Sequence, residues 1–170
     1  NQFDTLIQNS DIDSADLSEL VPCSFYGVLC SNAGLVEILT LGNNGLRGKI
    51  PASVFQLPGL VGLDMSYNYV DVDDDSGGFA SLKDATKLAR LKLSHTKIAS
   101  LAGIGQAVTL EELHLDGSDF ESSLPSELFD LTNLRVLHLD ASFLTGPLPS
   151  DIRRLSSLTR YEKHRKHQPR

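Results

Sequence analysis

The segments "LEELHLDGSDF" (residues 110–120) and "LRVLHLDASFL" (residues 134–144) begin 24 residues apart and share one pattern of leucines. Three further segments, which begin at Val36, Leu60 and Leu88, fit the same unit, L-x-x-L-x-L-x-x-N-x-L. The L-x-L alternation predicts a short strand with its leucines on one face. Because one unit cannot bury these leucines alone, successive units must stack and share a core. The sequence therefore predicts a solenoid of five repeats with a parallel sheet along one flank.

The ninth position of each unit predicts how the strand ends. Asn44 and Asn68 occupy it in the first two units, where a side-chain amide can satisfy backbone groups of the turn and of the neighbouring coil. Thr96, Ser118 and Ser142 replace Asn in the later units, so we expect a weaker ladder there. The return of the third unit repeats apolar residues every three positions, at Leu101, Ile104 and Ala107, which suits a 3₁₀ or short helical return.

Four motifs relate these repeats to a known family. "LRGKIP" (residues 46–51) and "LTGPLP" (residues 144–149) have the form L-x-G-x-I/L-P, and "FESSLP" (residues 120–125) is a weaker copy. "PCSFYGVLC" (residues 22–30) is similar to a P-C-x-W-x-G-V-x-C cap, with Phe25 in place of Trp. The chain thus resembles the plant-type, extracellular leucine-rich repeat family over roughly residues 20–158. The resemblance implies an α/β repeat fold, a right-handed solenoid whose parallel sheet forms the concave face.

The cysteines and the composition bear on the compartment. Cys23 and Cys30 are the only cysteines, and their spacing is not that of a CxxC redox or zinc motif. The residues alone favour one small disulfide in an oxidising compartment, with two free thiols in a reducing one as the alternative. The resemblance implies that the two cysteines pair, and that the protein is extracellular or at the cell surface. No apolar run approaches the ~20 residues of a membrane helix.

The net charge of the chain bears on which partners it can bind. The chain of 170 residues carries a net charge of −7, which argues against nucleic acid as a partner. The last twelve residues, in contrast, are basic. We expect a cap over residues 1–34, which contains an amino-terminal helix. Five repeats over residues 35–158 and a disordered basic tail over residues 159–170 should follow.

The two His-Leu-Asp triplets raise the question of a metal or catalytic site. His114 and His138 are at position five of their units, and Asp116 and Asp140 are at position seven, so alternation predicts all four on the solvent side of the sheet. Neighbouring imidazoles could share one metal ion. Lys92 is predicted beside His114, however, and a cation there opposes binding of another. We therefore predict no metal, no cofactor and no catalytic residue, with a pH-sensitive patch as an open alternative.

The residues that vary between units indicate the function. Positions two, three, five, seven and eight point away from the core and differ in charge and size, as on a recognition surface. Facing charges that satisfy one another, such as Asp64 with Lys92, are the alternative explanation. We predict a non-catalytic module that binds a protein or peptide through this face, receptor-like or inhibitor-like. Structural self-assembly or a co-receptor partner are the other hypotheses. The predicted ligand-binding residues are Tyr67, Arg90, Lys92, His95, Glu112, His114, Asp116, His138 and Asp140.

One acidic run invites a calcium interpretation. "DVDDDSGG" (residues 71–78) places Asp71, Asp73 and Asp75 at the first three spacings of an EF-hand loop. Ser76 stands where that loop needs Gly, and Leu82 where it needs Glu, so the motif fails. We expect an acidic loop that leads into a short helix.

Overall fold

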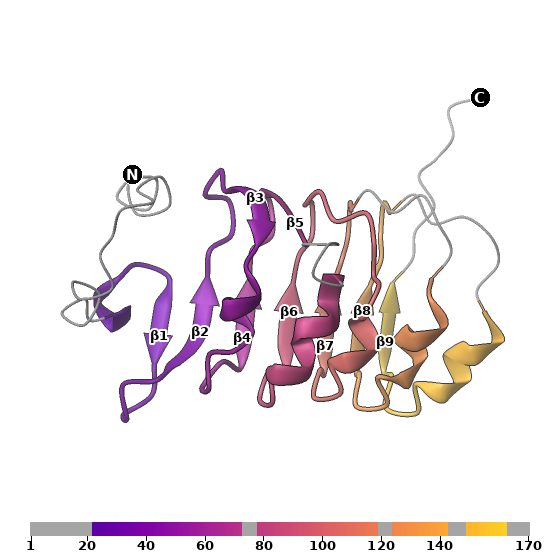
Figure 1. Cartoon of the computed structure of the whole chain (residues 1–170). Coiled ribbons are helices and arrows are strands. Elements are labelled where there is room, and N and C mark those ends of the chain that lie inside the picture. Colours follow the sequence, from indigo (N-terminus) through magenta and orange to yellow (C-terminus); the bar gives the residue numbers. More distant parts are fainter. Residues whose placement is uncertain (1–21, 73–77, 119–123, 143–148, 163–170) are drawn as a thin grey trace.

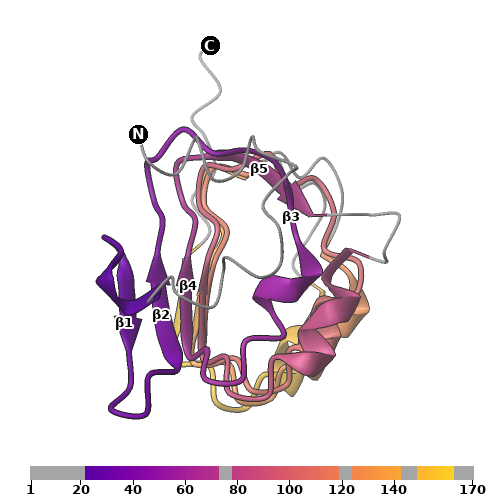
Figure 2. The ribbon, with the colours of Figure 1, turned by 60° about the vertical axis from the view of Figure 1, so that its left-hand side comes forward.

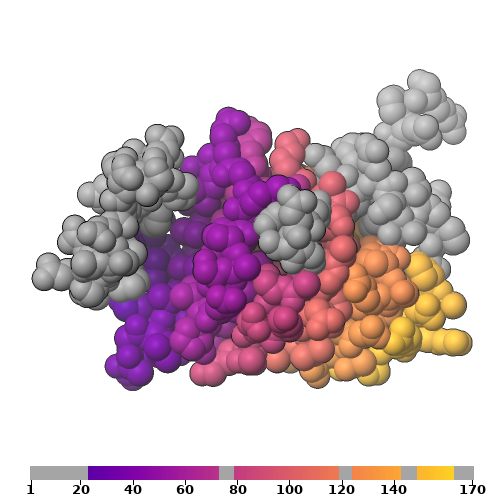
Figure 3. All heavy atoms as spheres, in the orientation of Figure 1, coloured from indigo at the N-terminus to yellow at the C-terminus, as the bar shows by residue number. Residues whose placement is uncertain are grey.

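A computed structural model describes residues 22–72, 78–118, 124–142 and 149–162. The predicted amino-terminal helix, most of the acidic run and the last eight residues lie outside these ranges. The chain is a solenoid whose coils follow one another in sequence order along the molecule (Figures 1 and 3).

Within the described residues, the main sheet has seven strands, and each of the five repeats contributes one of them. Its order is β1-β2-β4-β6-β7-β8-β9, with β1 antiparallel to β2 and every later neighbour parallel. The strands are β1 (Val28–Cys30), β2 (Val36–Thr40), β4 (Gly62–Asp64), β6 (Arg90–Lys92), β7 (Glu112–His114), β8 (Val136–His138) and β9 (Arg160–Glu162). This confirms the predicted leucine-rich-repeat solenoid with a parallel sheet along one flank.

The return halves of the coils lie opposite the main sheet (Figure 2). A second parallel sheet joins β3 (Arg47–Ile50) to β5 (Tyr69–Val72). In the described parts of the chain, the 3₁₀ helices are η2 (Pro22–Ser24), η3 (Ala52–Val54), η5 (Gly78–Asp84), η6 (Ile104–Gln106), η7 (Ser126–Asp130) and η8 (Ser150–Arg154). The helix predicted from the three-residue repeat of the third unit is therefore confirmed as η6, and the short helix after the acidic run as η5.

The core lies between the sheet and the return segments, and leucines from neighbouring strands stack in it. Leu63, Leu91, Leu113 and Leu137 are direct neighbours on successive strands, and each is at most 1% exposed. Phenylalanines from the return halves complete the interior at Phe55, Phe79 and Phe129. Because each coil buries its apolar side chains only against its neighbours, the sheet register fixes the position of every outward residue.

Asn68 confirms the predicted role of the ninth position. Its Nδ2 donates to the carbonyls of Leu41, Met65 and Ser66, at 2.9, 2.8 and 3.3 Å. Its Oδ1 accepts from the backbone N–H groups of Asn44 and Leu46, both at 3.0 Å. In the later units, Thr96, Ser118 and Ser142 each donate to one backbone carbonyl, that of Leu93, Leu93 and Leu115.

The two ends of the described solenoid differ. At the first end, Cys23 and Cys30 form a disulfide with Cα atoms 5.6 Å apart. At the other end the sheet continues past the predicted last repeat residue, Leu158, because β9 pairs in parallel with β8. Tyr161 occupies the position of a core leucine in β9. Residues 160–162, which lie beyond the predicted last repeat, thus pair with the main sheet.

Candidate ligand-binding face

The concave face, defined as the outward positions of the main sheet and of the turns that follow its strands, collects the predicted residues. Arg90, Lys92, Glu112, His114 and His138 lie in β6, β7 and β8, in the register predicted from the repeat. Asp116 and Asp140 lie two residues beyond the ends of β7 and β8. Next to Thr40 of β2, the titratable side chains at position five form a continuous row across five strands, made of Asp64, Lys92, His114, His138 and Glu162.

Part of the predicted charge pairing is present. Asp64 faces Lys92 and Arg90 faces Glu112 in the strand register. The exposed Arg135 and Glu111 form an ion pair at 4.0 Å. An exposed pair of this kind contributes about 0.2–1 kcal/mol, so such pairs leave the face available to a ligand.

A histidine pair lies at the centre of the row. The rings of His114 and His138 are 4.3 Å apart between centroids, and their side chains are only 19% and 13% exposed. Carboxylates surround the pair: Glu112 lies 4.0 Å from His114 Nε2, Asp116 lies 3.9 Å from His138 Nδ1, and Glu162 lies 3.8 Å from His138 Nε2. The pair is on the predicted face but far less solvated than alternation alone suggested.

The surroundings of this histidine pair fix its chemistry. Burial, then the neighbouring His138 and Lys92, lower the pKa of His114, while Asp116 and Glu112 act in the opposite direction. The neutral imidazole is therefore favoured. The Asp116 carboxylate is held in place because Ser94 Oγ donates to Oδ2 at 3.1 Å and the backbone N–H of Asp140 donates to Oδ1 at 2.9 Å.

An aromatic stack borders the concave face where the strands end. The eighth position of each coil has a left-handed backbone, at Asn43, Tyr67, His95, Gly117 and Ala141, with φ between 54° and 63°. The stack consists of the Tyr67 ring lying 4.6 Å from the His95 ring, with 20° between their planes. A Cβ at Gly117 would come within 2.3 Å of His95 Nδ1. Gly117 thus makes the room into which the imidazole packs.

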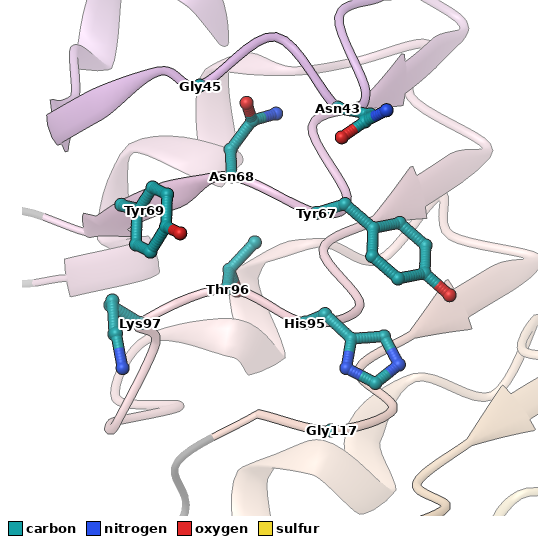
Figure 4. Close-up of a pocket in the computed structure, with 9 residues that line it drawn as sticks. All are labelled: Asn43, Gly45, Tyr67, Asn68, Tyr69, His95, Thr96, Lys97 and Gly117. Carbon is teal, nitrogen blue, oxygen red and sulfur yellow. The ribbon is translucent and has the colours of Figure 1, made fainter.

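Beside the stack is a hollow of about 430 Å³. Figure 4 shows it between the turns that follow β2, β4, β6 and β7. Its lining includes Tyr69 and Lys97, which sequence reasoning missed. The guanidinium of Arg47 lies 4.6 Å from the centroid of the Tyr69 ring, as in a cation–π contact. The signal for Tyr69 was present in the alternation of β5, whose Val70 and Val72 are buried.

A second hollow lies on the sheet itself, where Gly62 leaves a gap in the third-position row. It has a volume of about 280 Å³, and its lining includes Ile38, Asp64, Arg90 and Lys92. A Cβ at Gly62 would sit 3.7 Å from Arg90 Nε. Two cations at its rim suit an anionic group. Sequence analysis named Arg90 and Lys92 but did not anticipate this gap.

Comparisons with known proteins agree with the fold. No protein-family model matches the chain. It is 34% identical over 118 residues to MDIS1-interacting receptor like kinase 1 of Arabidopsis thaliana, which covers 67% of this chain and 11% of that protein. It is 32% identical over 114 residues to receptor protein-tyrosine kinase CEPR1 of the same plant, which covers 66% of this chain and 12% of that protein. The chain thus spans about a tenth of the length of these relatives.

Solved structures extend the comparison. A chain of the BIR3–SERK2 complex from Arabidopsis thaliana superposes with a TM-score of 0.68 at 28% identity, covering 90% of this chain and 84% of that one. The plant peptide hormone receptor RGFR1, in complex with RGF2, gives a TM-score of 0.65 at 26% identity, covering 80% and 20%. These similarities place the chain outside the cell or at its surface. In the parts of the chain that the structure describes, no helix is sufficiently long and apolar to span a membrane.

Proposed function

Because the chain belongs to the plant-type, extracellular leucine-rich repeat family, we propose that it is a non-catalytic, receptor-like ligand-binding module that holds an extended peptide across its concave face. The observation that carries this proposal is the unbroken fifth-position row of titratable side chains, in register across five parallel strands. A flat row of this kind offers contacts at regular intervals to a chain lying across the strands. It offers no enclosed pocket of the kind that catalysis requires.

The spacing of the strands sets the length of the ligand. Neighbouring strands lie about 4.8 Å apart, so the four intervals from Asp64 to Glu162 span about 19 Å. An extended peptide rises about 3.3 Å per residue. The row therefore accommodates about six peptide residues, and the aromatic stack and its hollow accommodate side chains beyond them.

The charges of the face indicate which ligand groups fit where. The hollow over Gly62, with Arg90 and Lys92 at its rim, suits a carboxylate of the ligand. The exposed ring of Tyr67, stacked on His95, suits an aromatic or aliphatic side chain, because aromatic groups frequently anchor interfaces. The similarity to a receptor whose structure is that of a complex with a peptide hormone supports the same assignment.

A selection experiment tests the proposal. The full chain is panned against a display library of random twelve-residue peptides, and the enriched peptides are synthesised and titrated by calorimetry. We expect Lys92→Glu to weaken their binding at least about tenfold, which corresponds to ~1.4 kcal/mol. Lys83→Glu is the matched control, because Lys83 is an exposed lysine of η5, away from the sheet.

Two results would contradict a concave binding face. One is equal affinity of the enriched peptides for wild type and Lys92→Glu. The other is the failure of every enriched peptide to bind wild type below about 100 µM, which corresponds to ~5.5 kcal/mol.

Self-association is the second candidate. Within the described part of the sheet, its end strands β1 and β9 pair on one side only, and strand edges of this kind favour pairing with another chain. Light scattering over a range of concentrations separates the two. A concentration-dependent oligomer that persists in Lys92→Glu favours assembly, and a monomer at all concentrations favours ligand binding.

A further inference from the structure

The histidine pair and Asp116 bring three ligand groups together. One ligand atom from each of His114, Asp116 and His138 lies within 4.8 Å of the other two. His114 is the last residue of β7 and Asp116 lies two residues after it. His138 is the direct neighbour of His114 on β8. The site therefore combines the register of two neighbouring strands with the first turn residue after β7.

We propose that His114, Asp116 and His138 bind one divalent transition-metal ion, with zinc as the best fit, and leave its fourth coordination position open toward the concave face. This proposal does not depend on the peptide ligand. Two imidazoles and one carboxylate are a ligand set that zinc takes, and three protein ligands with an open fourth position are typical of non-structural zinc sites.

The geometry is close to what zinc requires. Zinc–nitrogen and zinc–oxygen distances of about 2.0–2.2 Å place tetrahedral ligand atoms roughly 3.3 Å apart. The three side chains must therefore close by at most about 1.5 Å, which rotations of their outer torsions supply without moving the strands.

Two further observations support a ligand role. Asp116 is oriented by Ser94 Oγ and by the Asp140 backbone N–H, in the way that outer hydrogen bonds orient metal-binding carboxylates. His138 Nε2 is buried and has no hydrogen-bond partner among the described residues. A metal bound through Nδ1, the nitrogen that lies 3.9 Å from Asp116, would keep the proton on Nε2 and direct it toward the Glu162 carboxylate, 3.8 Å away, as outer carboxylates do for metal-bound imidazoles.

Lys92 is the counterargument, since it lies beside His114 in the register and its charge opposes a cation. The carboxylates of Glu112 and Glu162 lie within 4.0 Å of the imidazoles and offset this charge. The long lysine stem also allows the ammonium group to turn into solvent. Lys92 is therefore expected to weaken the site without abolishing it, which provides a diagnostic variant.

Calorimetric titration of the full chain with zinc chloride at pH 7 tests the proposal, and thermal unfolding with and without zinc gives an independent readout. We expect one ion per chain and a rise in Tm. His138→Gln and Asp116→Asn should weaken binding at least tenfold. Ser94→Ala should weaken it roughly tenfold, as loss of an outer hydrogen bond does. Lys92→Gln should strengthen binding, which no purely structural damage would produce.

Matched controls exclude other histidines. His95→Gln changes a histidine of the same face that lies outside the three ligands, and should bind zinc as wild type does. The double variant His164→Gln/His167→Gln removes the histidines of the basic tail and should also bind normally. Magnesium, which prefers oxygen ligands, should not compete.

The proposal is overturned if wild type shows neither binding heat nor a Tm shift at about 1 mM zinc. Binding with a Kd weaker than about 1 mM, a binding free energy of ~4.1 kcal/mol, counts as no site. It is also overturned if Asp116→Asn and Lys92→Gln both bind as wild type, or if the tail variant loses binding. If His138→Gln does not fold, these two remaining variants decide the outcome.

Discussion

Replacing Asn68 with alanine should destabilise the solenoid more than any other single change at the ninth position of the repeat. The Asn68 side chain is buried at 3% exposure and joins two coils through five hydrogen bonds, four of them 3.0 Å or shorter. Alanine removes the amide without filling its place, so that backbone groups of both coils lose their partners.

The magnitude follows from these four bonds. A hydrogen bond contributes about 1 kcal/mol net, and a buried group left without a partner costs about 1–3 kcal/mol. Water can reach the N–H groups of Asn44 and Leu46, whose residues are not buried, so part of the loss is recovered there. We expect the free energy of unfolding to fall by about 3 kcal/mol, and Tm to fall by roughly 6–12 °C for a chain of this size.

Urea unfolding followed by circular dichroism gives the free energy, and hydrogen exchange locates the change. Asn44→Ala is the matched control: Asn44 is exposed and its side chain donates only to Gly42 O, at 3.3 Å, so the loss should stay within about 0.5 kcal/mol. Exchange should accelerate at the amides of Asn44 and Leu46 in Asn68→Ala. Equal losses for the two variants, or a loss below about 1 kcal/mol for Asn68→Ala, would refute the ladder as the source of stability.

Four further outcomes follow from the structure. Replacing Cys23 and Cys30 with alanine should cost about 2.5 kcal/mol on the loop-closure estimate, and dithiothreitol should then have no further effect on urea unfolding. Ala141→Gly should raise the free energy of unfolding by about 0.5–1 kcal/mol, measured as a higher Tm, because φ is +54° at Ala141 and glycine lacks the penalty for that conformation. Tyr161→Phe should leave stability unchanged or raise it by about 1 kcal/mol in urea unfolding, since the hydroxyl is buried without a partner among the described residues. Gly117→Ala should destabilise by about 1 kcal/mol and displace the His95 ring, which NMR shifts of the imidazole would report.

The repeat made most of the fold predictable. Leucines at fixed spacing leave one way to bury them, and that register places His114 opposite His138 and Arg90 opposite Glu112, as the structure has them. Side-chain identity at outward positions does not affect this register. Which residues share the concave face could therefore be predicted from the sequence alone.

The details of the candidate site depend on what the pattern does not encode. The hollow over Gly62 arises from a missing side chain among larger neighbours. The alternation of the repeat predicts on which side of the sheet a residue lies, but not how deeply its side chain is buried. Glu162 of β9 lies 3.8 Å from His138 Nε2, and the repeats predicted over residues 35–158 did not include this strand. Parallel pairing uses backbone groups, so β9 forms although Tyr161 replaces the leucine.

The eighth residue of each repeat, in the turn after the strand, has a left-handed backbone and lies at the rim of the concave face. Tyr67, His95 and Ala141 adopt a backbone conformation that is uncommon outside glycine and asparagine, and none of the three is buried. Exchange of these side chains would therefore alter what the rim touches while the packed coils stay as they are. Asparagine, which tolerates this shape, is the natural starting residue for anyone who wishes to graft a new specificity onto the solenoid.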